Sequence, residues 1–115
     1  DYFQGKSLLP ILSGSSKGTE HRQFVRSEYF DALDPHFTGG DGTYATMYRT
    51  RSHKLCVYHG KGVGELFDMK KDPWEHHNLW NDPDSTEIKN QLLAESFDAH
   101  VLLTTDVGSK RIAPM

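Results

Sequence analysis

The sequence is poor in cysteine, in long apolar runs and in excess charge of either sign. Its single cysteine, Cys56, excludes an internal disulfide. No apolar stretch approaches the roughly 18 residues that a membrane span needs. The formal net charge of −3 offers no electrostatic attraction for nucleic acid or for an anionic membrane. The hydrophobic fraction of 36% is low, which predicts a small core that needs contact with a neighbouring domain for stability.

The length of 115 residues accommodates one domain. We expect residues 1–115 to be a single subdomain from the C-terminal end of a larger protein. Within it, residues 1–20 are predicted to be an interdomain segment and loop, residues 22–70 a sheet and residues 84–105 a helix. The first of these regions contains the apolar stretch Leu8–Leu12, followed by a loop rich in serine and glycine.

Four short segments favour β-strands because they alternate apolar and polar residues or are rich in β-branched and aromatic residues. They are residues 23–30, 44–50, 54–59 and 65–69. Glycine, proline and aspartate fill the connections, with a long turn-rich one at residues 31–43 and a tight one at Gly60–Gly64. Consecutive strands joined by such turns predict an antiparallel arrangement.

The C-terminal segment has the pattern of a helix. Asp84 with Glu87 three residues later predicts a capping box. An apolar stripe at helical spacing follows, and the helix should end near residue 105. The stripe consists of Ile88, Leu92, Ala99 and Leu103, widened by Leu93 and Phe97. Strands followed by one helix predict an α+β fold, a small antiparallel sheet of about four strands packed by one C-terminal helix.

Cys56 and the serines of residues 13–16 are the candidate nucleophiles. Strand alternation places Cys56 on one sheet face, where a free cysteine packs as a small apolar residue. Residues 13–16 contain three serines but have no histidine in a recognisable motif beside them, so they are interpreted as a solvated loop.

Histidines were considered as metal ligands. The adjacent His76 and His77 have His53, His59 and His100 as distant partners, but neighbouring histidines usually point apart and the spacing fits no metal-ligand pattern. We interpret this segment as a surface loop that Asn78 and Leu79 pin to the sheet. Asp82 and Asp84 fit turn and helix-cap chemistry. Gly60–Gly64 is followed by a strand instead of a helix, so it favours a β-turn over a phosphate-binding loop. No catalytic, cofactor-binding or metal-binding residue is assigned to the chain.

Several segments share a pattern in chain order. Residues 4–12 (QGKSLLPIL) match G-[RK]-S-L-x-P-L-L, and residues 47–55 contain R-T followed by K-L. Residues 65–79 match E-L-Y-D-L-x-x-D-P-x-E-x-x-N-L. Together with residues 26–29 (RSEY) and the final helix, these segments resemble the C-terminal region of sulfatases of the alkaline-phosphatase-like superfamily.

The resemblance implies a parent enzyme that hydrolyses sulfate esters. Formylglycine, made from a cysteine or serine in a C/S-x-P/A-x-R motif, and calcium are expected in an N-terminal catalytic domain. Cys56 does not lie in that motif, so this chain alone is predicted to be inactive. Its implied partner is the catalytic domain, on which it would pack and whose substrate cleft it would help to shape. The resemblance also implies a periplasmic or secreted location.

Two other functions stay open from the sequence. One is a free-standing glycan- or protein-binding module that uses Trp74, Trp80 and Tyr48, although these residues are also suited to anchoring a core or a loop. The other is the tail of a related phosphonate or phosphodiester hydrolase. The unbroken apolar stretch Leu8–Leu12 further predicts an exposed patch, and through it a homodimer.

Overall fold

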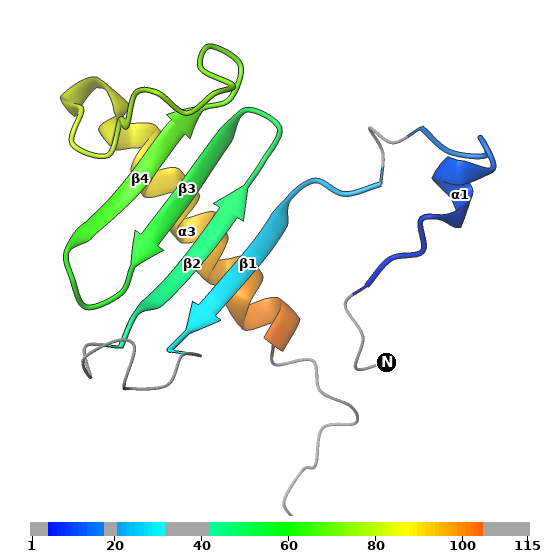
Figure 1. The fold of residues 1–115 in the computed structure, drawn as a ribbon, viewed down its shortest axis with the longest axis horizontal. Coiled ribbons are helices and arrows are strands. Elements are labelled where there is room, and N and C mark those ends of the chain that lie inside the picture. The colour runs from blue at the N-terminus through cyan, green and yellow to red at the C-terminus, as the bar shows by residue number, and fades with distance from the viewer. Residues whose placement is uncertain (1–4, 18–20, 32–41, 105–115) are drawn as a thin grey trace, which may run out of the picture. The chain divides into compact units, whose positions relative to one another are not determined.

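The computed structural model describes residues 5–17, 21–31 and 42–104. Four strands pair antiparallel in the order β1-β2-β3-β4 (Figure 1), and one long helix follows them. The predicted α+β fold, with about four strands and one C-terminal helix, is confirmed. The elements are α1 (Leu9–Leu12), β1 (Val25–Phe30), β2 (Tyr44–Arg49), β3 (His53–Tyr58), β4 (Val63–Asp68), the 3₁₀ turn η2 (Pro83–Ser85) and α3 (Thr86–Thr104).

The strands begin within two residues of their predicted starts, and local turn chemistry explains two of the connections. Between β2 and β3, the Thr50 hydroxyl accepts hydrogen bonds from the backbone N–H groups of Ser52 (3.3 Å) and His53 (3.1 Å). Between β3 and β4, Gly60 and Gly62 have φ angles of 76° and 68°, which glycine adopts without steric cost. The predicted turn here is confirmed. The predicted connection before β2 lies mostly outside the described residues.

The strand register gives the sheet two different faces. Tyr48, Leu55 and Leu66 are neighbours on one face, and only 5%, 1% and 0% of their surfaces are exposed. We call this side the covered face. The opposite side, which we call the open face, carries the alternate residues of each strand. These are Val25, Ser27 and Tyr29 of β1, Ala45, Met47 and Arg49 of β2, Lys54, Cys56 and Tyr58 of β3, and Val63, Glu65 and Phe67 of β4.

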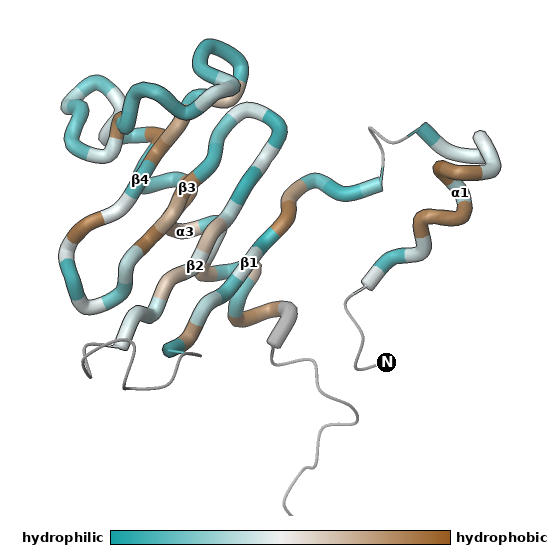
Figure 2. The backbone as a smooth tube through the Cα atoms, viewed as in Figure 1, coloured by the Kyte–Doolittle hydropathy of each residue, from teal (hydrophilic) through white to brown (hydrophobic). Residues whose placement is uncertain are grey.

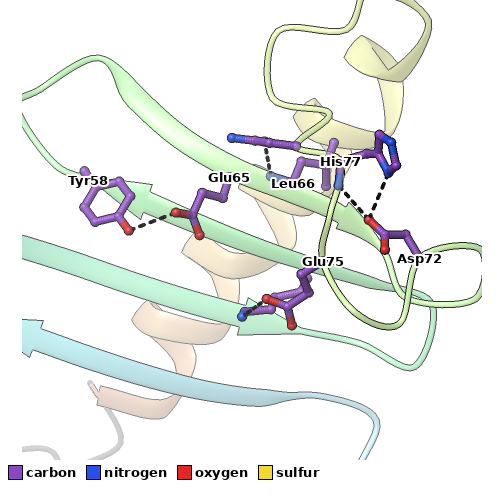
Figure 3. Close-up of polar contacts among 8 residues, drawn as sticks. Tyr58, Glu65, Leu66, Asp72, Glu75 and His77 are labelled. Carbon is purple, nitrogen blue, oxygen red and sulfur yellow. Dashed lines mark hydrogen bonds and ion pairs between the residues drawn. The ribbon is translucent and has the colours of Figure 1, made fainter.

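Helix α3 lies behind the sheet in Figure 3, while Tyr58 and Glu65 point to the viewer's side. The first two turns of the helix are therefore on the covered face. Its first two turns belong to the same compact unit as the sheet, Gln23–Leu93, and Leu92 in these turns is 2% exposed. Leu55, Leu66, Leu92 and Tyr48 are thus the buried apolar residues of this side of the sheet, and their burial stabilises the fold.

Trp80 packs against Gly64 of β4 on the covered face. A β-carbon at Gly64 would collide with the Trp80 ring and with the carbonyl oxygen of Cys56, so only glycine fits there. Lys89 of α3 reaches back to this point. Its Nζ atom donates to the Trp80 carbonyl at 2.6 Å and lies 5.1 Å from the centre of the indole ring.

The start of α3 and its apolar stripe correct two predictions. Asp82 is the N-cap of the 3₁₀ turn η2, since its carboxylate accepts from the backbone N–H of Asp84 (3.2 Å) and from the Ser85 hydroxyl (2.7 Å). Asp84 lies inside this 3₁₀ turn and α3 begins at Thr86, so the capping box predicted at Asp84 is wrong. Phe97 does not widen the stripe, since it is 67% exposed. At 100° per residue it lies roughly 140° around the helix from Leu92.

The stripe itself is confirmed where the structure describes it. Leu92 and Ala99 are buried, and Ile88 and Leu93 are half-buried. The side chain of Leu103 lies outside the described residues.

The N-terminal apolar stretch forms the single helical turn α1, shown in brown in Figure 2. Pro10 lies in its first turn, a position where its missing N–H costs nothing. Leu8, Leu9 and Leu12 are 58%, 67% and 80% exposed, so this stretch does bear exposed apolar side chains. Its role as an interdomain segment stays a prediction.

Candidate functional surface

The loop that follows β4 is fastened to the sheet edge by Asn78. Its Oδ1 atom accepts from the backbone N–H groups of Leu66 (3.0 Å) and Trp80 (2.9 Å), and its Nδ2 atom donates to the carbonyl of Gly64 (3.1 Å). The backbone N–H of Leu79 also donates to the Leu66 carbonyl at 2.8 Å. The predicted pinning of this loop by Asn78 and Leu79 is confirmed. Because β4 is an edge strand, the loop also protects its unpaired backbone groups.

Two aspartates shape the same loop from within. Asp68 Oδ1 accepts from the backbone N–H groups of Lys70 (3.0 Å) and Lys71 (3.1 Å), and Asp72 Oδ2 accepts from that of His77 (2.8 Å). Hydrogen bonding to the backbone, that of Lys71 first, lowers the pKa of Asp68. The backbone N–H groups of His76 and then His77 likewise lower the pKa of Asp72. Both aspartates therefore have turn-forming roles.

An ion pair joins the loop to the open face. Lys54 Nζ of β3 lies 2.6 Å from Glu75 Oε2, and the two side chains are 22% and 30% exposed (Figure 3). The hydrogen bond to Glu75 raises the pKa of Lys54. Glu75 has a φ of 60°, a left-handed conformation that is uncommon for a residue other than glycine. Lys54 Nζ also lies 5.9 Å from the ring centre of Phe67, which is only 6% exposed.

The middle of the open face holds Cys56, Glu65 and Tyr58. Cys56 lies opposite Glu65 in the strand register, and the Tyr58 hydroxyl donates to Glu65 Oε1 at 3.2 Å (Figure 3). Burial raises the pKa of the Cys56 thiol, and the negative charge of Glu65 raises that of Tyr58. A nucleophilic cysteine needs a lowered pKa, so this environment supports the interpretation of Cys56 as a packing residue.

The histidines considered as ligands are dispersed. His76 and His77 are exposed on the loop, as predicted. The ring of His53 lies 3.0 Å from the Ser52 hydroxyl, and that of His59 lies 2.9 Å from the Thr46 hydroxyl. Within residues 5–17, 21–31 and 42–104, no three histidine, cysteine, aspartate or glutamate side chains are grouped so that they could hold a metal ion.

The three aromatic residues of the binding-module hypothesis do not lie on one exposed surface. Tyr48 is buried on the covered face and contacts Phe24, with 5.0 Å between ring centres. Trp80 is half-buried against Gly64, and Trp74 alone of the three is open to solvent, at 80%. Tyr48 and Trp80 thus have the anchoring roles considered for them.

The serines of the N-terminal loop bond locally. The hydroxyls of Ser13 and Ser15 lie 3.0 Å apart, and both donate to the carbonyl of Pro10. This arrangement is a turn that follows α1, without a base in reach of either hydroxyl among these contacts.

Sequence reasoning missed the pair of Lys54 and Glu75. The two residues are 21 positions apart and lie in segments that had been matched separately to sulfatase patterns. Their opposite charges were the available signal, but many such pairs exist in a chain with 13 basic and 16 acidic residues. The structure shows that two pattern-bearing segments, residues 47–55 and residues 65–79, meet on one side of the sheet.

A family model supplies the decisive comparison. The model of the N-sulphoglucosamine sulphohydrolase C-terminal region matches residues 1–100. The chain belongs to this family of sulfatase C-terminal domains. It is 36% identical over 84 residues to the Delta 4,5-hexuronate-2-O-sulfatase of Bacteroides thetaiotaomicron, covering 73% of this chain and 16% of that enzyme. It is also 33% identical over 93 residues to an uncharacterized protein of Haemophilus influenzae, covering 81% and 43% of the two chains. The chain thus spans less than half of either curated relative.

Solved structures agree with this family. A 2-O GAG sulfatase superposes with a TM-score of 0.73 at 30% identity, over 90% of this chain and 21% of that one. The phosphonate monoester hydrolase of Agrobacterium radiobacter has a TM-score of 0.62 at 18% identity, over 86% and 21% of the chains, and shares the fold. No helix among the residues that the structure describes is sufficiently long and apolar to cross a membrane.

Proposed function

We propose that this chain is the C-terminal subdomain of an active sulfatase, in which it packs on the catalytic domain and helps to shape the substrate cleft. The family match over residues 1–100 carries the proposal. The loop clamped by Asn78 and by the Lys54–Glu75 pair gives it a structural basis, because a rigid loop on a sheet scaffold holds its side chains in fixed positions for a partner or substrate.

The chemistry of hydrolysis is assigned to the catalytic domain. Formylglycine would supply the nucleophile there, and calcium would hold the sulfate group. The chain contains no C/S-x-P/A-x-R motif, and its described residues form no metal-ligand group, so neither group fits this subdomain. The related 2-O-sulfatases favour a sulfated uronic-acid glycan as the natural substrate class.

The test compares the chain alone with the whole protein, by which we mean the polypeptide that joins this chain to its catalytic domain. Both are assayed on an aryl sulfate with calcium. The whole protein should turn over the substrate and the chain alone should not. Turnover that scales with the purified chain and disappears in Cys56→Ala would overturn the assignment, as would a whole protein with formylglycine in place that shows no sulfatase activity.

The second candidate is the tail of a phosphonate or phosphodiester hydrolase, since such an enzyme shares the fold. An aryl phosphonate and an aryl phosphodiester belong in the same assay. A whole protein that prefers either of them to the aryl sulfate would replace the sulfatase proposal with this one.

We further propose that the isolated chain forms a homodimer through the apolar stretch around α1. The exposure of Leu8, Leu9 and Leu12 supports this, because a contiguous exposed apolar patch promotes association. Replacing Leu9 and Ile11 by serine should shift the chain towards monomer in sedimentation. A native chain that stays monomeric at high concentration would contradict the dimer.

A further inference from the structure

The open face is more apolar than a solvated sheet face should be. In an antiparallel sheet with one face in water, the outward residues are mostly polar. Here eight of the twelve outward residues are apolar or aromatic. They are Val25, Tyr29, Ala45, Met47, Cys56, Tyr58, Val63 and Phe67.

Seven of these eight side chains are exposed or half-buried, whereas Phe67 is only 6% exposed. Val25 is 45% exposed, Tyr29 37% and Val63 54%. Met47 and Cys56, between them on the central strands, are half-buried. An exposed apolar surface of this kind marks an interaction site.

The charged residues of the open face are unevenly distributed between its two ends. The row formed by Tyr29, Ala45, Tyr58 and Val63 across the four strands has no charged residue. Two rows away, Arg49 lies beside Lys54. Lys54 is engaged by Glu75, whereas Arg49 is exposed and has no ion-pair partner among the described residues. A partner for this face should therefore offer an apolar surface at one end and a carboxylate near Arg49 at the other.

We infer that the open face is the surface on which the catalytic domain of the whole protein sits. The inference rests on the proposed function. The matched sulfatase structure indicates which partner binds this face. This chain corresponds to 21% of the length of that enzyme, so the other four fifths must pack against a surface of this subdomain. The covered face holds the first turns of α3 and, of its apolar residues, leaves only Phe30 and Tyr44 exposed at one end of its strands, at 49% each, so the open face is the broader apolar surface left for that contact. A second copy of the chain would offer only one carboxylate from this face, Glu65, which already accepts a hydrogen bond from the Tyr58 hydroxyl.

Cys56 provides the test, since it is the only cysteine of the chain and lies at the centre of the open face. Its labelling by N-ethylmaleimide is followed by peptide mass spectrometry in the chain alone and in the whole protein, in the same buffer. The matched control is Asn90→Cys, an exposed position on α3 in the same compact unit. Labelling of Cys56 should slow by at least about tenfold in the whole protein, while the control reacts equally in both.

Equal labelling of Cys56 in the two forms would overturn the inference, and protection of Asn90→Cys instead would assign the contact to the helix side. The aryl-sulfate assay tests the proposed sulfatase function independently of this interface. A whole protein that is active but leaves Cys56 reactive refutes the interface alone. A whole protein that protects Cys56 but hydrolyses no sulfate ester supports the interface and refutes the function.

Charge reversal gives a second measurement. Arg49→Glu should leave the stability of the chain alone unchanged and lower the unfolding midpoint of this subdomain in the whole protein, because it would oppose the partner's carboxylate. Lys61→Glu, in the exposed turn before β4, is the matched control and should change neither. Equal midpoints for Arg49→Glu and the control in the whole protein would count against the open face.

Discussion

The two faces of the sheet differ in how completely the chain itself buries their apolar residues. On the covered face, Tyr48, Leu55 and Leu66 are almost completely buried within the chain, and Trp80 and Lys89 close the contact with α3. On the open face, apolar residues remain in part exposed beside the Lys54–Glu75 pair. The comparison teaches that the chain itself buries the apolar residues at the centre of its covered face, whereas its open face keeps apolar side chains in contact with water.

The largest effect is expected on the covered face. Leu92→Asp should destabilise the chain by about 3–5 kcal/mol, because an unpaired charge would be buried where Leu92 is 2% exposed. Urea unfolding measures this loss. Asn90→Asp, two residues away and exposed, is the control and should stay within about 0.5 kcal/mol of the parent. Equal stability of the two variants would mean that the helix faces the sheet differently.

A smaller loss is expected where the loop is fastened to the sheet edge. Asn78→Ala should cost about 1–3 kcal/mol, since it leaves the backbone N–H of Leu66 without its acceptor. Hydrogen exchange at the Leu66 amide should accelerate together with the change in urea midpoint. Asn81→Ala, at a neighbouring exposed position, is the control. Unchanged exchange at Leu66 would show that the Asn78 side chain is not what holds the loop.

The smallest effect belongs to the ion pair on the open face. A double-mutant cycle with Lys54→Met and Glu75→Gln should give a coupling of about 0.5–1 kcal/mol, because both side chains retain contact with water.

The pH dependence of this pair has a defined sign. The pKa of Lys54 is raised from 10.5 in the folded chain, so its stabilising contribution is complete below the unfolded value and is lost as the pH rises through the folded value. The coupling should therefore persist at about pH 8 and decline above about pH 10.5. A coupling that instead falls on acidification from about pH 8 to about pH 6 would contradict Lys54 as the titrating partner.

The strands and the helix were predictable because their signals are local. Alternation in residues 44–50 and 54–59, and the i, i+4 pair of Ile88 and Leu92, reflect the periods of strand and helix. The prediction of a cap at Asp84 missed the 3₁₀ turn Pro83–Ser85, because a 3₁₀ turn before a helix has no distinct sequence mark. Phe97 was misjudged because it is apolar and near the stripe in sequence, yet lies on another side of the helix.

The candidate surface was less predictable for a different reason. Loop anchoring by Asn78 follows from a local pattern, whereas the pairing of Lys54 with Glu75 and the contact of Trp80 with Gly64 depend on strand register and on the path of the loop. The register is set by long-range pairing, and a shift by one residue would move every side chain to the opposite face. The apolar excess of the open face became visible only once that register was known.

Leu55 and Cys56 offer the most direct test of the two-face account, because they are adjacent in β3 and point to opposite sides. Urea unfolding of the chain alone should show a loss of about 2–5 kcal/mol for Leu55→Ala, which leaves a cavity on the covered face. Cys56→Ala should lose less than about 1.5 kcal/mol, since its side chain is only half-buried on the open face. Equal losses, or a greater loss for Cys56→Ala, would contradict the account.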